Sequence, residues 1–339
     1  MALLEVKDLK TYFSTGDGMV RAVDGVSFSV DKGQTLGIVG ESGSGKSVTC
    51  LTIMGLNAKR YTITSGQALF NGEDLLAASQ SRLREIRGND IAMIFQDPMT
   101  SLNPVHSVGK QLVEAVQLHS EVSKTQARAR ALELLKEVGI PRADRRIDDY
   151  PHQFSGGMRQ RVMIAMALIN NPELLNADEP TTALDVTTQA QILTLIENLQ
   201  REYNSAVIMI THDLGVVAEI ADDVVVMYAA QVAEKGSVDE IFHRPRHPYT
   251  WGLMGSLPRL NADVDRLVQI QGQPPSLLRP PSGCRFHPRC PYVMDVCRTV
   301  NPDLAPAGDD VDHLQACHLD EATKEREAAR LLGAVAGAS

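Results

Sequence analysis

The stretch Gly40-Glu41-Ser42-Gly43-Ser44-Gly45-Lys46-Ser47 decides the fold, because it fits the phosphate-loop pattern G-x-x-x-x-G-K-S/T. The apolar residues 36–39 predict a buried strand before it, and residues 47–56 predict a helix directly after it. In such a unit the loop N–H groups and the helix N-terminus surround phosphate oxygens. The sequence therefore predicts a nucleoside triphosphate site.

This loop supplies most of the expected nucleotide contacts. Lys46 is expected to reach the β- and γ-phosphates, and the Ser47 hydroxyl is expected to bind Mg²⁺. The expected nucleotide-binding residues in this segment are Gly40, Ser42, Gly43, Ser44, Gly45, Lys46, Ser47 and Val48.

Composition narrows the class of protein. The chain has 339 residues, of which 43% are hydrophobic, enough for one large domain and a smaller one. It has neither a long apolar run nor an N-terminal signal pattern, so we expect no membrane span and no export. The net charge of −9 argues against broad nucleic-acid binding. Five cysteines in such a chain indicate a reducing compartment, where thiols serve more often as ligands than as disulfides.

The order of patterns predicts an α/β fold. The first ninety or so residues read as short strands with a hairpin signal at Asn71-Gly72, which indicates an antiparallel N-terminal part. Helical spacing over about 97–170 predicts an inserted helical subdomain, and strands then alternate with helices, as in a mostly parallel sheet. We expect one nucleotide-binding domain over 1–240 and a Pro- and Cys-rich C-terminal extension over 241–339.

Polar residues at expected strand ends complete the site. Asp178 follows a buried strand and is expected to hold Mg²⁺ through water, while Glu179 would polarise the attacking water. Gln96 would ligate Mg²⁺ and sense the γ-phosphate, and His212 would hydrogen-bond the same phosphate. Ligands collect at the carboxyl ends of parallel strands, which favours this interpretation over isolated polar residues.

A second anion site is expected ahead of a helix that begins at Met158. Ser155, Gly156 and Gly157 offer a hydroxyl and two N–H groups there. With the phosphate loop, Gln96, the acidic pair, His212 and the segment Ala183-Leu184-Asp185, this stretch resembles the signature set of ABC ATPases over about residues 3–240. The resemblance implies that two ATPase subunits pack head to tail, so that the signature of one, including Met158, closes over nucleotide bound by the other.

An aromatic platform for adenine is implied upstream. Phe13 lies where the family places its stacking aromatic, and Tyr12 is the alternative because adjacent strand residues face opposite sides. Ordinary core packing of Phe13 is a third interpretation.

The likeness is closer to one branch of the family. Residues 96–104, 247–250 and 283–291 resemble segments of ATPase subunits from dipeptide and oligopeptide importers, of the D type. That resemblance implies a homologous F-type ATPase partner, two membrane permease subunits and, indirectly, an extracytoplasmic peptide-binding protein. It places the chain peripherally on the cytoplasmic face of the bacterial inner membrane.

Two residues depart from the family pattern. Asn176 stands where an aliphatic residue usually completes the strand before Asp178, and a buried amide without partners costs about 1–3 kcal/mol. Ala230 stands where glycine is usual, so it is strained if the turn requires a positive φ.

Four cysteines form a separate candidate metal centre. Cys284, Cys290, Cys297 and Cys317 are spaced C-x5-C-x6-C-x19-C. Four thiolates suit either a 4Fe–4S cluster or tetrahedral zinc, and the absence of a short C-x2–4-C pair, together with the importer resemblance, favours the cluster. Unligated or disulfide-linked thiols are the third alternative. Cys50 is expected to be a packing residue.

The leading hypothesis is an ATP-hydrolysing subunit that energises dipeptide or oligopeptide import. Nickel, glutathione or another solute is the alternative cargo, since this subunit is not expected to touch the cargo. A cytosolic ATPase linked to nucleic acid is the hypothesis from another class; the acidic charge and single ATPase unit argue against it and against a nucleic-acid partner.

Overall fold

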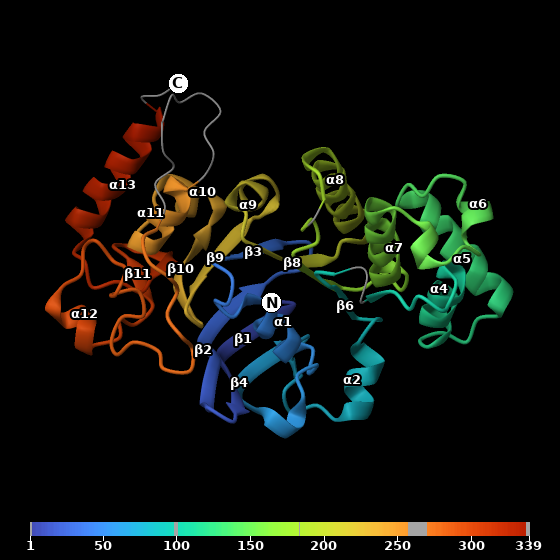
Figure 1. The fold of residues 1–339 in the computed structure, drawn as a ribbon, viewed down its shortest axis with the longest axis horizontal. Helices are drawn as coiled ribbons and strands as arrows, with labels where there is room; N and C mark the ends of the chain where they lie inside the picture. Colours follow the sequence, from blue (N-terminus) through green and yellow to red (C-terminus); the bar gives the residue numbers. More distant parts are fainter. Residues whose placement is uncertain (1, 98–100, 183, 257–269, 337–339) are drawn as a thin grey trace. The chain divides into compact units, whose positions relative to one another are not determined.

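The computed structural model describes residues 2–97, 101–182, 184–256 and 270–336 (Figure 1). The chain divides into two compact units, and each is described by itself. Unit 1 contains residues 30–34 and 78–209, and unit 2 contains residues 2–29, 35–77 and the chain from Ile210 onward.

Unit 2 begins with an antiparallel sheet. Its strands are β1 (Leu4–Thr15), β2 (Gly18–Val30), β4 (Thr62–Phe70) and β5 (Glu73–Asp74), in the order β2-β1-β4-β5. β1 runs antiparallel to β4, with Phe13 opposite Thr62. Asn71 and Gly72 both have positive φ, 48° and 82°, so they form the tight turn that the sequence indicated.

A second group of strands in unit 2 carries the phosphate loop at one end. The order is β11 (Ala305–Ala307), β12 (Asp310–Gln315), β10 (Gln231–Ser237), β9 (Asp223–Tyr228) and β3 (Thr35–Val39). β3 and β9 are parallel, whereas β10, β12 and β11 add antiparallel pairs. The C-terminal extension therefore continues the sheet, which is mixed at this edge.

The helices of unit 2 pack beside these strands, and their apolar faces form its core. They are α1 (Lys46–Ile53), η1 (Lys59–Tyr61), α9 (Leu214–Ile220), α10 (Val238–His243), α11 (Pro248–Gly255), α12 (Asp295–Thr299) and α13 (Glu321–Ala336). Tyr228, Tyr249 and Phe286 belong to one buried cluster, so the extension shares its core with β9. α13 packs against α11 (Figure 1).

Unit 1 contains a parallel pair of strands and most of the long helices. β6 (Ile91–Ile94) pairs with β7 (Leu174–Asp178), and β8 (Ala206–Thr211), next to β7, leads from unit 1 into unit 2. The helices are α2 (Gln80–Ile86), α4 (Val108–Gln117), α5 (Lys124–Glu137), α6 (Ala143–Arg146), η2 (Pro151–Gln153), α7 (Gly156–Leu168) and α8 (Val186–Tyr203).

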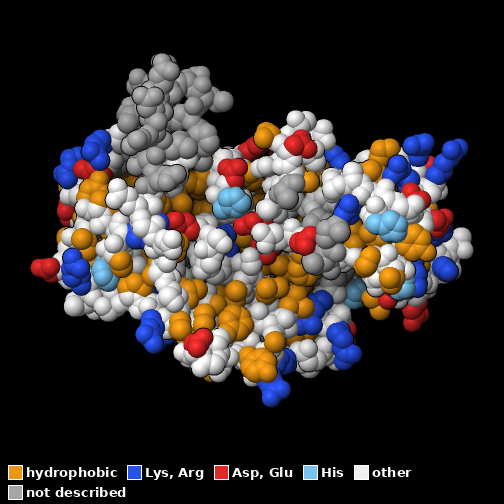
Figure 2. All heavy atoms as spheres, viewed as in Figure 1, with side chains coloured by type: hydrophobic (Ala, Val, Ile, Leu, Met, Phe, Trp, Pro, Cys, Tyr) orange, Lys and Arg blue, Asp and Glu red, His pale blue; other side chains and the backbone are white. Residues whose placement is uncertain are grey.

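These elements confirm the α/β class, the antiparallel N-terminal part and the run of helices after β6. Acidic and basic side chains are interspersed over the face drawn in Figure 2. Within the described ranges, every helix is too short or too polar to cross a bilayer.

Candidate nucleotide site and cysteine cluster

The phosphate loop connects β3 to α1 in unit 2, and its shape requires glycine. Gly40 has φ of 150°, and a Cβ there would lie 2.1 Å from the Met227 carbonyl oxygen. Gly45, which precedes α1, has φ of 104°, and a Cβ there would lie 2.3 Å from the Ala22 carbonyl oxygen. Both contacts are with backbone that cannot move aside. Larger side chains at these two positions would therefore deform the loop.

Lys46 is held against this loop. Its side chain is buried, and its Nζ donates hydrogen bonds to the carbonyl oxygens of Gly40 at 2.7 Å and Glu41 at 3.1 Å. The ammonium thus rests on polar atoms that a phosphate oxygen can replace. Ser47 follows it in the first turn of α1, where the helix N-terminus favours negative charge.

A strained hairpin forms a hydrogen bond with the phosphate loop. Ala229 and Ala230 form the two-residue connection between β9 and β10, with φ of 44° and 73°. The Ala230 N–H donates to the Ser44 carbonyl at 3.0 Å. The turn does require a positive φ at Ala230, so this residue is strained as expected. A residue with a Cβ in the left-handed region costs about 1–2 kcal/mol.

The acidic pair ends β7 in unit 1. Glu179 has φ of 46°, an unusual conformation for a residue with a side chain and one typical of functional sites. Its Oε2 accepts hydrogen bonds from Gln96 Nε2 and Thr182 Oγ1, both at 2.9 Å. Unit 1 therefore brings Gln96 and Glu179 together, and it adds Thr182, which the sequence analysis did not identify. The sequence signal that could have identified Thr182 is a hydroxyl residue three positions after the expected catalytic base.

Asn176 lies inside β7 with a fully buried side chain. Neither its Nδ2 nor its Oδ1 has a hydrogen-bond partner among the described residues. The amide therefore carries the desolvation cost expected for an unpaired buried polar group. Asp178, two residues on, stays buried at the end of the strand.

The expected signature lies at the start of α7 in unit 1. Ser155 is the N-cap and accepts a hydrogen bond from the Met158 N–H at 3.3 Å. Ser155 and Gly156 are exposed, and no atom lies within 4 Å of a Cβ added at Gly156. At Gly157 an added Cβ would lie 3.1 Å from Thr188 Cγ2.

The next expected segment leads into α8. Asp185 is its N-cap and accepts hydrogen bonds from the Thr188 N–H at 3.0 Å and hydroxyl at 2.7 Å. These bonds lower the pKa of Asp185 below its ordinary value. Leu184 is half-buried, and Ala183 lies outside the described residues.

The remaining expected nucleotide contacts belong to unit 2. Phe13 is half-buried near the end of β1, and His212 is exposed directly after β8. Tyr12, the alternative to Phe13, donates to Asp24 Oδ1 at 2.5 Å. Burial and this hydrogen bond raise the pKa of Tyr12 to about 12. The Tyr12 ring is thereby fixed to a neighbouring strand.

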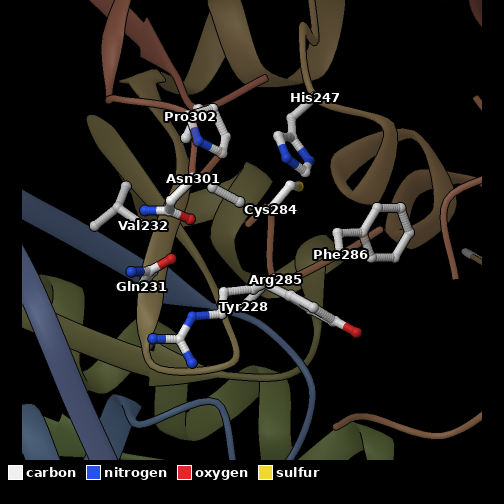
Figure 3. A pocket seen from close by; sticks show the side chains of 11 residues that line it. Tyr228, Gln231, Val232, His247, Cys284, Arg285, Phe286, Asn301 and Pro302 are labelled. Atoms are coloured by element: carbon white, nitrogen blue, oxygen red, sulfur yellow. The ribbon is translucent and has the colours of Figure 1, made fainter. Parts of the chain in front are cut away.

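The four cysteines of the extension surround one small cavity in unit 2. Cys284, Cys290, Cys297 and Cys317 all line it. Cys284 also lines the adjoining pocket shown in Figure 3, where Arg285 and Phe286 point away from each other. The structure thus brings together residues up to 33 positions apart in the sequence (284 to 317).

Backbone hydrogen bonds and burial act in opposite directions on the thiols that line this cavity. Backbone N–H groups of Phe286, Tyr292 and Leu319 hydrogen-bond to the sulfurs of Cys284, Cys290 and Cys317. Burial is the main cause that raises the thiol pKa of Cys290 to about 12 and that of Cys317 to about 11. A bound cation would offset that cost by favouring the thiolates.

Another group, Glu240, Asp310 and His313, has ligand atoms within 4.8 Å of one another. Arg244 already pairs with both carboxylates, at 3.5 and 3.8 Å. His313 Nε2 lies 2.8 Å from Glu234. The carboxylates of Glu240 and Asp310 thus already have a cationic partner in Arg244.

Comparison with known proteins gives a consistent match. The ABC transporter family matches residues 23–182, and the oligopeptide/dipeptide transporter C-terminal region matches residues 233–297. The chain is 54% identical over 301 residues to the oligopeptide transport ATP-binding protein OppD of Escherichia coli, covering 89% of each. It is 56% identical over 295 residues to the dipeptide transport ATP-binding protein DppD of Lactococcus lactis, covering 87% of this chain and 84% of the relative.

Solved structures agree with this match. The dimeric post-hydrolysis state of the ATP-binding cassette MJ0796, bound to ADP and Pi, is similar with a TM-score of 0.63 and 28% identity. The structural match covers 69% of this chain and 98% of the cassette.

Proposed function

This chain belongs to the ABC transporter family, as an ATP-binding subunit of the oligopeptide and dipeptide type, and we propose how its residues carry out that role. It hydrolyses ATP to energise peptide import through a membrane transporter. The observation that carries the site assignment is the hydrogen bond from Gln96 to Glu179, which positions the expected base beside a γ-phosphate sensor.

The reaction is phosphoryl transfer to water. Lys46 exchanges its bonds to the loop carbonyls for bonds to β- and γ-phosphate oxygens, and loop N–H groups bind the same oxygens. Glu179 accepts a proton from the attacking water, while Thr182 and Gln96 hold its carboxylate in place. Mg²⁺, held by Ser47, Asp178 and Gln96, would neutralise developing charge on the phosphates.

Two ATPase subunits form the functional pair. The exposed Ser155 and Gly156 at the N-terminus of α7 offer an anion site to a neighbouring subunit, with Gly157 and Met158 behind them. The likeness to a dimeric cassette supports this arrangement. The partner is a homologous F-type ATPase. Purification of the transporter from its own membranes tests this: an F-type subunit in equal amount supports it, and two copies of this chain alone overturn it.

The pair docks on two permease subunits at the cytoplasmic face of the inner membrane, and an extracytoplasmic binding protein delivers the peptide. Absence of long apolar helices among the described residues is compatible with peripheral attachment. Washing membranes with alkaline carbonate should release the chain, and its retention would contradict peripheral attachment.

The four cysteines hold a 4Fe–4S cluster. The N–H groups aimed at the sulfurs and the dry surroundings suit thiolate ligands. On one tetrahedral zinc ion, sulfurs lie about 3.8 Å apart, given the zinc–sulfur bond length. In the described structure the ligand atoms of these cysteines do not gather within 4.8 Å of one another, so a single zinc ion would require the sulfurs to move closer together. Anaerobic purification and iron, sulfide and zinc analysis test this: stoichiometric zinc without iron overturns it.

Dipeptides are the first cargo to test. Cells lacking the gene are complemented with wild type or Lys46→Ala, and uptake of labelled dipeptides and longer peptides is measured. Uptake restored only by wild type supports an ATP-driven peptide importer. Restored uptake of longer peptides alone changes the cargo, and unchanged uptake of both overturns the peptide assignment in favour of another solute.

A further inference from the structure

The phosphate loop and the C-terminal extension are in direct contact at Glu41. Arg289 donates to Glu41 Oε2 at 2.6 Å and to Glu41 Oε1 at 2.9 Å, in a two-pronged ion pair. The Arg289 side chain is 5% exposed, and that of Glu41 is 27% exposed. A paired geometry of this kind is stronger and more directional than an ordinary surface ion pair.

A second residue of the extension fixes the backbone of the same loop residue. The Glu41 N–H donates to the Tyr249 hydroxyl at 2.8 Å, and Tyr249 is fully buried in α11. The Glu41 carbonyl in turn accepts from Lys46 at 3.1 Å. Glu41 is thus held at its N–H and side chain by the extension, while its carbonyl holds the phosphate-binding lysine.

Both anchors make further contacts. Phe286 packs against Tyr228 and Tyr249, with ring centroids 5.1 and 5.5 Å apart. Arg289 also donates to the Tyr228 hydroxyl at 3.3 Å and to the Gln271 carbonyl at 2.9 Å. Arg289 immediately precedes Cys290, which lines the cysteine cavity.

We propose that Arg289 and Tyr249 are positioning residues for the phosphate loop, so that the C-terminal extension sets the affinity of this ATPase for ATP. Arg289 neutralises the one carboxylate within the loop that receives a polyphosphate. Tyr249 fixes the peptide that places Lys46. This inference rests on ATP binding by the loop and adds the extension as a determinant of it.

The ion pair between Arg289 and Glu41 makes ATP affinity depend on the charge at Glu41. In Arg289→Gln, the Glu41 carboxylate loses its counter-charge and repels the nucleotide, so ATP affinity should fall about tenfold or more. Since repulsion grows with phosphate charge, ATP should lose more affinity than ADP. In the double variant Arg289→Gln/Glu41→Gln the repulsion is gone, so most of the ATP affinity should return.

Titration of the purified full chain with a fluorescent ATP analogue and with its ADP counterpart tests this. Arg128→Gln is the matched control, because Arg128 makes a similar two-pronged pair with Asp148 in unit 1, at 2.9 and 2.8 Å. Its nucleotide affinity should equal that of wild type. Thermal unfolding of each variant identifies any that fail to fold.

Tyr249→Phe provides an independent test, because it removes only the hydroxyl. It should weaken ATP several-fold while its ATP-to-ADP ratio stays near that of wild type. Equal ATP affinity in wild type, Arg289→Gln and Tyr249→Phe overturns the positioning role. A double variant as weak as Arg289→Gln overturns the charge argument. If wild type itself does not bind ATP, the proposed function fails instead.

Discussion

Gln96 donates a hydrogen bond from its Nε2 to Glu179 Oε2 over 2.9 Å, although the two residues are 83 positions apart in the chain. The bond joins the end of β6 to the end of β7, which are neighbouring parallel strands. The bond therefore links the proposed γ-phosphate sensor to the proposed catalytic base.

Gln96→Ala should therefore reduce kcat for ATP hydrolysis by about tenfold, because the Glu179 carboxylate loses one of its two positioning donors. ATP binding without Mg²⁺ should change little. Steady-state hydrolysis and nucleotide titration measure both quantities. Gln117→Ala is the control, since the Gln117 side chain donates to the Val122 carbonyl in the helical part of unit 1. Equal kcat in the two variants would count against a role for Gln96.

Asn176→Leu should raise the free energy of unfolding by about 1–3 kcal/mol, because it removes an unpaired buried amide at similar volume. Urea unfolding of the two proteins measures the difference. Asn170→Leu is the opposite case: its amide donates to the carbonyls of Gly88 at 2.8 Å and Ala115 at 3.1 Å, so that variant should be destabilised. Destabilisation by Asn176→Leu would show that its amide has a partner such as water.

Ala230→Gly should stabilise the chain by roughly 0.5–1 kcal/mol, since glycine avoids the left-handed strain at φ of 73° but loses more entropy on folding. Chemical denaturation measures this. Ala233→Gly, within β10 where no positive φ is required, should lower stability instead. The two substitutions are chemically identical, so a loss of stability in both would refute strain at the turn.

The metal-free chain should lose stability as pH rises above about 9. Burial raises the pKa of Cys290 from 9.0 to about 12 and of Cys317 to about 11. At pH values between 9 and about 11 the thiols of the unfolded chain release protons, while those of the folded chain keep theirs. The rise in pH therefore favours the unfolded state. Urea midpoints at pH 8 and pH 10 measure the effect. The double variant Cys290→Ser/Cys317→Ser should show a smaller fall, and an equal fall would contradict the assignment.

Much of this fold and site could be predicted because the signals are local. The phosphate loop and the Asn71-Gly72 turn each depend on residues that are close in the chain. The helices that follow β6 agree with the helical spacing expected over about 97–170. Local rules were sufficient for these elements.

The contacts of Glu41 could not be predicted, because Arg289 and Tyr249 lie 248 and 208 positions away. Their motifs were recognised only as parts of the extension. The pairing of β12 with β10 also depends on tertiary packing, since neither strand shows which edge it joins. The hydrogen bond from Thr182 to Glu179 follows from the unusual backbone at Glu179, which sequence patterns do not reveal.

The most direct measurement is ATP binding and hydrolysis by the assembled transporter with Glu179→Gln. The neutral amide keeps the size of the side chain but cannot accept the proton of the attacking water. ATP affinity should stay within about twofold of wild type, while turnover should fall by about a hundredfold or more. Turnover equal to wild type would contradict Glu179 as the catalytic base and, with it, the assignment of this site.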